Sequence, residues 1–238
     1  MNFLNRSSKR ELMDDLSLDT EHLQKIYADI NRVNKVLQGF SISLGAIKKI
    51  MEENPQESYA IMDVGCGDGA MLRKVASYFK GSSLELKLTG IDLNPRSIQL
   101  ARESSREYPY INFVVQDILA MESNNLQCDI LMCSLTMHHF DNMEIPVFLN
   151  QFVKLSRLGV IINDLQRSQV AYYLFQLFSL IFMRTKVAKH DGLVSIKSAF
   201  TKEDLMTYSY DLPKVKHHIR WRWAFRYLWV IHIEQENI

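Results

Sequence analysis

The feature that most constrains the fold is a glycine-rich turn that directly follows a short apolar segment. Residues 61–70 read IMDVGCGDGA, where the apolar run ends at Val64 and glycines follow at positions 65, 67 and 69. Glycine lets the backbone approach a ligand closely, and a helix that begins after Ala70 would point its first N–H groups at that ligand. The pattern therefore predicts a β-strand, a ligand-binding loop and a helix.

The rest of the chain repeats this alternation of strand and helix. Short apolar segments at 59–64, 84–91, 111–115, 128–133 and 159–163 are typical of strands, and helical patterns follow Ala70, Pro95 and Ser168 and cover 145–155. Strands separated by helices form a parallel sheet through right-handed crossovers. The last two extended segments, 213–223 and 224–234, have no helix between them, so they should pair as an antiparallel hairpin at one edge.

Length and composition allow one α/β domain with additions. The 238 residues, 47% of them apolar, are enough for a single large core. Residues 1–55 have helical periodicity and are predicted to form an N-terminal helical cap on a domain of residues 56–238, with a helical insertion at about 167–200. In that insertion, apolar residues from Tyr172 to Ile181 lie nearly all round the predicted helix, which indicates burial on several sides.

Charge, cysteine content and hydropathy restrict the partners and the cellular compartment that the chain is expected to have. A formal net charge of +1 gives no general attraction for nucleic acid. Three widely spaced cysteines indicate neither a disulfide framework nor a zinc site, and they fit a cytoplasmic protein. The charged N-terminal residues are unlike a secretory signal, and no apolar run reaches the roughly 18 residues of a membrane span.

Aspartates near the glycine turn indicate which cofactor binds. Asp92 follows the second strand about 20 residues after the glycines, where a carboxylate can accept both hydroxyls of a ribose. Gly65, Gly67 and Ala70 also fit the turn that binds nicotinamide dinucleotides. Asp63 and Asp117 favour a different ligand. A nearby carboxylate stabilises the ammonium group of a methionine moiety, whereas Asp63 and Asp68 so close to the turn would repel a pyrophosphate.

In this order and spacing, the motifs resemble the class I S-adenosylmethionine-dependent methyltransferases from about Tyr59 to the C-terminus, and SxxMHHF at 134–140 is similar to their small-molecule branch, which includes enzymes of quinone biosynthesis. The resemblance implies a seven-stranded Rossmann-like sheet in the order 3-2-1-4-5-7-6, with strand 7 antiparallel and helices on both faces. It places Asp63, Gly65 and Gly67 at the methionine moiety and Asp92 at the ribose, with Asp117, Ile118 and Leu93 around adenine. The predicted cofactor-binding set is completed by Cys66, Gln116 and Ser134.

The candidate catalytic residues are histidines beyond the fourth strand and in the insertion. His139 and His138 end that strand, and His190 is expected in a turn with Asp191 and Gly192 at the pocket mouth. His139 or His138 could accept a proton from an acidic acceptor, although a packed pair of histidines is a common structural alternative. The predicted acceptor-binding residues are Asp164, Tyr172 and Phe175. Tyr27, Asn31 and Asn34 are expected on solvated helix faces, with a lid over the active site as the alternative.

The sequence thus predicts a methyltransferase that uses S-adenosylmethionine and acts on a small, largely apolar acceptor of aromatic or polyketide/quinone-like type, with O-methylation favoured over C-methylation. No metal is expected, because only Asp141 and Asp164 offer carboxylates near the fourth and fifth strands. No nucleic-acid partner is expected, since the N/D-P-P-Y/F motif of nucleic-acid methyltransferases is absent. The protein is expected to be a monomer or homodimer. Two alternatives stay open: an NAD(P)-dependent oxidoreductase with the same glycine turn, and a non-catalytic binding module with this fold.

Overall fold

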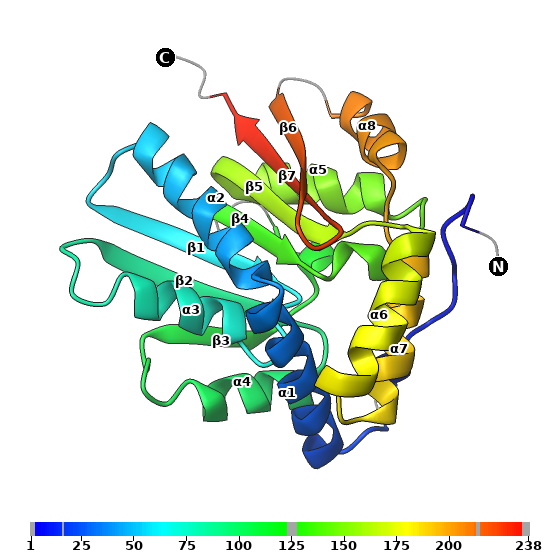
Figure 1. Ribbon diagram of the computed structural model, residues 1–238. Coiled ribbons are helices and arrows are strands. Elements are labelled where there is room, and N and C mark those ends of the chain that lie inside the picture. The colour runs from blue at the N-terminus through cyan, green and yellow to red at the C-terminus, as the bar shows by residue number, and fades with distance from the viewer. Residues whose placement is uncertain (1–2, 16, 123–127, 213–214, 235–238) are drawn as a thin grey trace.

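A seven-stranded sheet in the order β3-β2-β1-β4-β5-β7-β6 forms the centre of the molecule (Figure 1). The computed structural model describes residues 3–15, 17–122, 128–212 and 215–234. Neighbouring strands from β3 to β5 pair in parallel, and β7 pairs antiparallel with both β5 and β6. The strands are β1 (Ser58–Val64), β2 (Glu85–Asp92), β3 (Ile111–Val115), β4 (Cys128–Ser134), β5 (Ser156–Leu165), β6 (Val215–Arg222) and β7 (Arg226–Ile233). The predicted fold class, strand order and terminal hairpin are confirmed.

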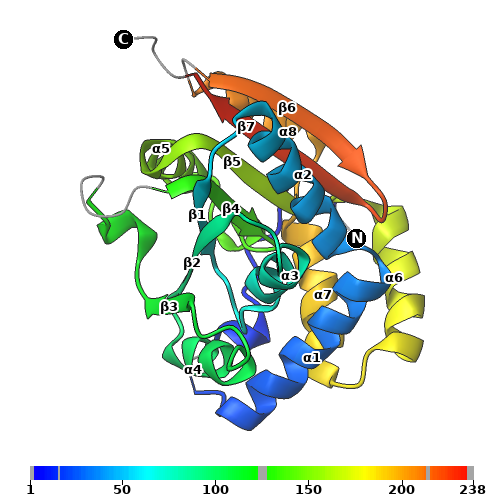
Figure 2. The ribbon, with the colours of Figure 1, turned by 90° about the vertical axis from the view of Figure 1, so that its left-hand side faces the viewer.

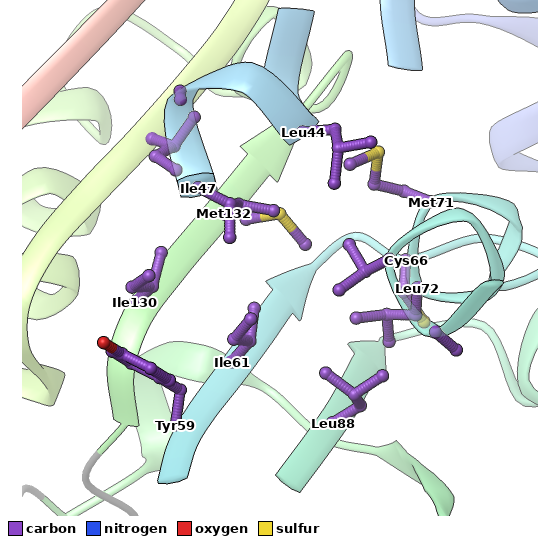
Figure 3. Close-up of a cluster of buried hydrophobic side chains, with 14 of the residues drawn as sticks. Leu44, Ile47, Tyr59, Ile61, Cys66, Met71, Leu72, Leu88, Ile130 and Met132 are labelled. Atoms are coloured by element: carbon purple, nitrogen blue, oxygen red, sulfur yellow. The ribbon is translucent and has the colours of Figure 1, made fainter. Parts of the chain in front are cut away.

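Helices cover both faces of this sheet, which explains why its central strands are apolar on both sides. One face packs against α2 (Gly39–Glu53), α3 (Ala70–Tyr78) and α4 (Pro95–Ser104), and the other against α5 (Ile145–Leu155) and α8 (Lys202–Tyr210). Figure 3 shows the first face, where Ile47 of α2 and Leu72 of α3 lie over Ile61 and Ile130 of the central strands. The core therefore holds the carboxyl ends of β1, β2 and β4 in fixed positions.

The two long helices of the predicted N-terminal cap have different surroundings. Helix α2 is a layer of the sheet domain, since Ile47 and Ile50 are fully buried against it. Helix α1 (Thr20–Val36) begins at Asp19, whose carboxylate accepts the His22 N–H at 2.8 Å. Only α1 and the segment 3–15, which contains the short helix η1 (Leu12–Asp14), lie beyond the carboxyl ends of the strands, beside α6 and α7 (Figures 1 and 2).

The region predicted as an insertion forms α6 (Gln169–Phe182) and α7 (Lys186–Ser198), capped by the side chains of Ser168 and Thr185. The turn predicted at 190–192 is wrong, because α7 continues through it. There the Asp191 carboxylate accepts the N–H groups of Leu12 and Met13, each at 2.9 Å. Gly192 is needed for packing rather than for turning, since a Cβ at this position would collide with the ring of Phe175.

The prediction that α6 is buried on several sides is also wrong. Ala171 and Tyr172 are buried against Ile196 of α7, but Leu177 and Ile181 on the opposite face are 64% and 79% exposed. The helix therefore packs on one side only. Among the described residues, no helix has the length and apolar character needed to cross a membrane.

Candidate active site

The loop between β1 and α3 carries the glycines of the sequence motif. Gly65 and Gly67 have φ angles of +69° and +53°, a region that side chains other than glycine disfavour. A Cβ at Gly67 would lie 2.7 Å from the ring of Tyr27 on α1, and one at Gly65 would collide with Thr136. The glycines thus allow the loop to pass between α1 and the end of β4 while lining one cavity of about 920 Å³.

Asp92 at the end of β2 holds this loop in place. Its two carboxylate oxygens accept the N–H of Gly67 at 3.0 Å and the N–H of Asn94 at 2.9 Å. Burial raises the pKa of Asp92, although these two N–H groups partly offset the effect. Each carboxylate oxygen has a further lone pair, and Asp92 lines the cavity, so the group can still accept hydroxyl hydrogen bonds.

Asp63 in β1 is a carboxylic acid that lacks a partner. It is 3% exposed, it lines the cavity, and no hydrogen bond joins it to any residue that the structure describes. Burial, with a smaller effect from the charge of Asp92, raises the pKa of Asp63 to about 8. A buried carboxyl group facing a cavity in this way is suited to a cationic group of a ligand.

The remaining residues of the predicted cofactor set line the same cavity: Cys66, Leu93, Gln116, Asp117, Ile118 and Ser134. Asp117 caps the short helix η2 (Ile118–Ala120) by accepting the Leu119 N–H at 2.9 Å, and Leu93 is 67% exposed at the rim. Burial raises the pKa of the Cys66 thiol well above its usual value, so this cysteine remains a neutral packing group. The ten predicted cofactor residues are therefore brought together.

A buried ion-pair cluster lies at the end of β4, where the chain forms the short helix η3 (Met137–His139). His138 Nδ1 lies 2.7 Å from Asp164 Oδ1, and its Nε2 lies 3.3 Å from Glu11 Oε1. Burial alone would lower the pKa of His138, but the charges and hydrogen bonds of these two carboxylates raise it to about 10. The two carboxylates therefore favour the protonated form of His138, which argues against its predicted role as a base.

His139 has a different environment. Its side chain is 24% exposed and lines the cavity, with Nδ1 3.1 Å from Asp14 Oδ2 and Nε2 3.8 Å from Glu11 Oε2. The charges of His139 and Asp14 both affect the pKa of Asp92, which places them close to the cofactor residues. His139 combines access to the cavity with a carboxylate that can orient its ring, whereas His138, which also lines the cavity, is more deeply buried between two carboxylates.

Glu11 and Asp14 come from the N-terminal segment, and the sequence reasoning missed them. Burial would raise the pKa of Glu11, but His138 and His139 lower it overall, and the Ser195 hydroxyl donates to the same carboxylate. The segment is fixed by Arg6, which donates to the carbonyl oxygens of His138 and Phe140, each at 3.0 Å. No periodic pattern marks these residues, so only the fold could reveal their position.

Three predicted residues lie away from the cavity wall. Asp164 is buried behind His138, and Tyr172 is buried against Phe3 and α7, so neither can contact an acceptor directly. His190 lies within α7 with Nε2 3.0 Å from Lys9 Nζ, outside the cavity lining. Phe175 does line the cavity. So do Tyr27, Asn31 and Asn34, which corrects the expectation that they are solvated.

The same cluster contains the only group of metal-ligand type among the described residues. Ligand atoms of Glu11, His138 and His139 lie within 4.8 Å of one another. Asp164 and Asp14 already pair with the two histidines, so the cluster is balanced as a set of ion pairs. The absence of a metal requirement therefore stays a prediction.

The middle of the chain matches a known family. Residues 61–159, which run from β1 into β5 and include the glycine loop, Asp92, Asp117 and both histidines of η3, match the family model described as a methyltransferase domain. The chain contains a methyltransferase domain.

Relatives of this methyltransferase domain among curated proteins match over short stretches. Malonyl-[acyl-carrier protein] O-methyltransferase 1 of Ilyobacter polytropus is 30% identical over 70 residues, which cover 29% of this chain and 25% of that protein. Nodulation protein S of Sinorhizobium fredii is 35% identical over 65 residues, or 27% of each chain. The matches thus span about a quarter of the length of these relatives.

Solved structures resemble the methyltransferase domain over most of its length. The plantazolicin methyltransferase BpumL, in complex with a pentazolic desmethylPZN analog and SAH, has a TM-score of 0.66 and 16% identity, covering 93% of this chain and 98% of that one. The magnesium protoporphyrin IX methyltransferase ChlM from Synechocystis PCC 6803, with bound SAH, has a TM-score of 0.58 and 12% identity, covering 86% and 87%. At these identities the likeness shows a shared fold.

S-adenosylmethionine is the cofactor of this methyltransferase domain, and the residues present fit it. Asp63 offers an unpartnered buried carboxyl group for the ammonium group, and Asp92 offers acceptors for the ribose hydroxyls. Glycine at position 67 lets the Tyr27 ring lie directly against the loop, since a Cβ there would come within 2.7 Å of the ring. Ile118 and Leu93 offer apolar contacts for adenine.

Replacing Asp92 by Ala in the methyltransferase domain should weaken binding of S-adenosylhomocysteine by about 10- to 150-fold. The loss corresponds to roughly 1.5–3 kcal/mol for hydrogen bonds to a charged group, and it includes the loosening of the loop at Gly67. Isothermal calorimetry measures it, with Asp211→Ala as a control at a surface carboxylate outside the cavity. An unchanged affinity would remove Asp92 from the cofactor site.

Proposed function

We propose that this protein transfers a methyl group from S-adenosylmethionine to an oxygen atom of a small, largely apolar acceptor of aromatic or polyketide/quinone-like type. The observation that supports this most is the continuity of the cavity, whose wall includes both the cofactor residues and a set of apolar side chains. The apolar part is formed mainly by Val33, Leu37, Phe40, Phe175, Phe178 and Met183. A chamber of this kind suits a flat apolar molecule better than a nucleic acid.

His139, which lines this cavity, serves as the proton acceptor. Asp14 beside Nδ1 favours the tautomer that keeps its proton there, which leaves the Nε2 lone pair for the acceptor hydroxyl. Once His139 has taken this proton, the carboxylates of Asp14 and Glu11 stabilise the resulting imidazolium. The phenolic or enolic oxygen is then a stronger nucleophile.

His138 acts as a positioning residue in this scheme. Its imidazolium joins Glu11 of the N-terminal segment to Asp164 of β5, and it fixes the backbone of η3 because the His138 N–H donates to Asp164 Oδ2 at 3.1 Å. Bound S-adenosylmethionine supplies an electrophilic methyl group for an in-line displacement, whose rate depends on how well the acceptor oxygen is held. The rigid η3 segment provides that alignment.

The three cysteines are free and buried, which fits the cytoplasmic location that we propose.

Two alternative functions are distinguished by binding and turnover. Parallel calorimetric titrations with S-adenosylhomocysteine and with NAD should give binding of the first alone, because the Asp63 carboxyl group can pair with an ammonium group and offers no partner to a pyrophosphate. Binding of NAD alone would instead support an oxidoreductase.

Turnover is measured with methyl-labelled S-adenosylmethionine, in buffer with EDTA, against a panel of phenols that includes 2-naphthol and a long-chain resorcinol. Transfer of label to a hydroxyl oxygen supports the proposal, and transfer to carbon would change the acceptor atom. Tight binding of S-adenosylhomocysteine with no transfer to any phenol would favour a non-catalytic binding module.

A further inference from the structure

The outer face of α6 is an unusual feature of the surface. Its six apolar side chains, spaced at helical intervals, are between 49% and 79% exposed: Val170, Tyr173, Leu174, Leu177, Leu180 and Ile181. Proteins that stay free in solution seldom expose so many large apolar groups side by side. Figures 1 and 2 show α6 at the outer edge of the molecule, with α7 behind it.

The orientation of this face is fixed by contacts on the inner side of α6. Ala171 and Tyr172 are buried in a cluster with Ile196 of α7, and Phe175 lies against Gly192. The exposed face therefore has a defined shape and direction.

The turn between β6 and β7 extends the exposed apolar surface. Phe225 of this turn packs on the same cluster as Ala171 and Tyr172, so the turn lies beside α6. Trp221 and Trp223 flank Phe225, with ring centroids 6.3 Å and 6.0 Å from it, and they are 47% and 62% exposed. We call these two tryptophans and the six residues of α6 the apolar rim.

The apolar rim is continuous with the cavity of the active site. Leu174 and Trp223 are both largely exposed and both line that cavity. One side of each residue therefore faces the solvent while the other faces the proposed acceptor chamber. An apolar acceptor that enters between α6 and the β6–β7 turn would therefore pass from the apolar rim directly into the apolar part of the cavity.

Basic residues lie near both parts of the apolar rim. Arg184 and Lys186 follow α6, and Arg220 and Arg222 lie on β6 next to the turn. Two acidic residues also contact these segments, since Asp29 accepts the Arg184 N–H and Glu234 pairs with Lys216 further along β6. Arg167 is paired with the carboxylate of Asp204, but Arg184, Lys186 and Arg220 are exposed near the rim. Tryptophans at the margin of an apolar face, with basic residues around it, are typical of proteins that lie on an anionic lipid surface.

We propose that the apolar rim docks on an anionic lipid membrane and that the acceptor reaches the cavity from the lipid. A second copy of the chain fits less well, because an isologous contact would bring the same basic residues of both copies together. An acidic protein would match the charge but would place a polar surface against the aliphatic face of α6. The docking itself does not depend on the proposed function; only the route of the acceptor does.

The test uses sedimentation with vesicles of phosphatidylcholine and phosphatidylglycerol, compared with vesicles of phosphatidylcholine alone. The wild-type protein binds the anionic vesicles more strongly, and the difference falls with added salt. The triple variant Leu177→Gln, Leu180→Gln, Ile181→Gln loses at least tenfold in vesicle affinity. None of these three residues lines the cavity, so its affinity for S-adenosylhomocysteine and its melting temperature stay unchanged.

The matched control is Tyr110→Gln with Met143→Gln, at residues that are 52% and 85% exposed and lie outside the rim, and it binds vesicles as the wild type does. Three results would overturn the proposal: no sedimentation of the wild type, undiminished binding by the triple variant, or a rim-dependent dimer in light scattering without vesicle binding. Rim-dependent binding to a purified acyl carrier protein in place of vesicles would likewise assign the surface to an acidic protein. Since no acceptor is present, these results do not depend on whether methyl transfer occurs.

Discussion

The variant Asp63→Asn should be more stable than the wild type at pH 7 and above, and should bind the cofactor product much more weakly. The pKa of Asp63 is raised from an unfolded value near 3.8 to about 8 by burial and by Asp92. Between these values the folded state holds a proton that the unfolded state has lost, so stability falls as the pH rises through this window. Asparagine does not ionise, so Asp63→Asn should raise the free energy of unfolding by roughly 2–4 kcal/mol at pH 7.

Thermal unfolding at pH 5, 7 and 8 measures the first effect. The gap between variant and wild type should widen with pH, with the variant melting several degrees higher at pH 8. Asp117→Asn is the control, because this exposed cap keeps an acceptor for the Leu119 N–H and should leave the melting temperature unchanged. A variant that melts below the wild type at pH 8 would mean that the Asp63 carboxylate is already paired.

Binding of S-adenosylhomocysteine should respond to the same carboxyl group in the opposite direction. Loss of a charged partner for the ammonium group should reduce affinity by about 10- to 150-fold. For the wild type, affinity should increase from pH 6 towards pH 8 by up to about tenfold per unit, because Asp63 must ionise to bind a cation. The variant should lose this increase, and a parallel pH dependence in both proteins would contradict the assignment.

The cofactor end of the site could be predicted because its residues are set by local structure. Gly65 and Gly67 occupy a loop whose positive φ angles only glycine adopts easily, and Asp63 and Asp92 lie at fixed places in a strand–turn–helix–strand unit. Sequence spacing within such a unit translates directly into positions in space. The alternation of strands and helices predicted only a parallel sheet with an antiparallel terminal hairpin, and the strand order came from the resemblance to class I methyltransferases.

The acceptor end could not be predicted in the same way, because its geometry depends on tertiary contacts. Glu11 meets His138 across 127 positions of sequence, and nothing in a polar N-terminal segment distinguishes it from a solvated residue. Asp191 and Gly192 resemble a turn, yet in the fold they bind the N-terminal segment and admit Phe175. Adjacent histidines likewise look equivalent in sequence, while the carboxylates around them give them different roles.

That difference leads to the second large effect, on turnover. His139→Ala should lower kcat by about 10²- to 10⁴-fold, the usual contribution of a general base, with little change in affinity for S-adenosylhomocysteine. The His139 ring lines the cavity beside Asp14 and does not pack in the hydrophobic core, so the melting temperature of the variant should change little. Turnover is measured with the phenol that the labelled-methyl assay identifies as the best acceptor.

Added imidazole should partly restore turnover to His139→Ala, because the cavity left by the side chain is open to solvent and the missing function is a proton acceptor. His138→Gln provides the contrast. This variant loses the ion pairs with Asp164 and Glu11, so its melting temperature should be lower than that of the wild type, and added imidazole should not restore its turnover. Asp14→Asn should fall between the wild type and His139→Ala, since it weakens the orientation of the ring without removing it. If His139→Ala keeps full turnover, the acceptor must lose its proton directly to water, and the cluster of Glu11, Asp14 and the two histidines serves only to hold the N-terminal segment over the cavity.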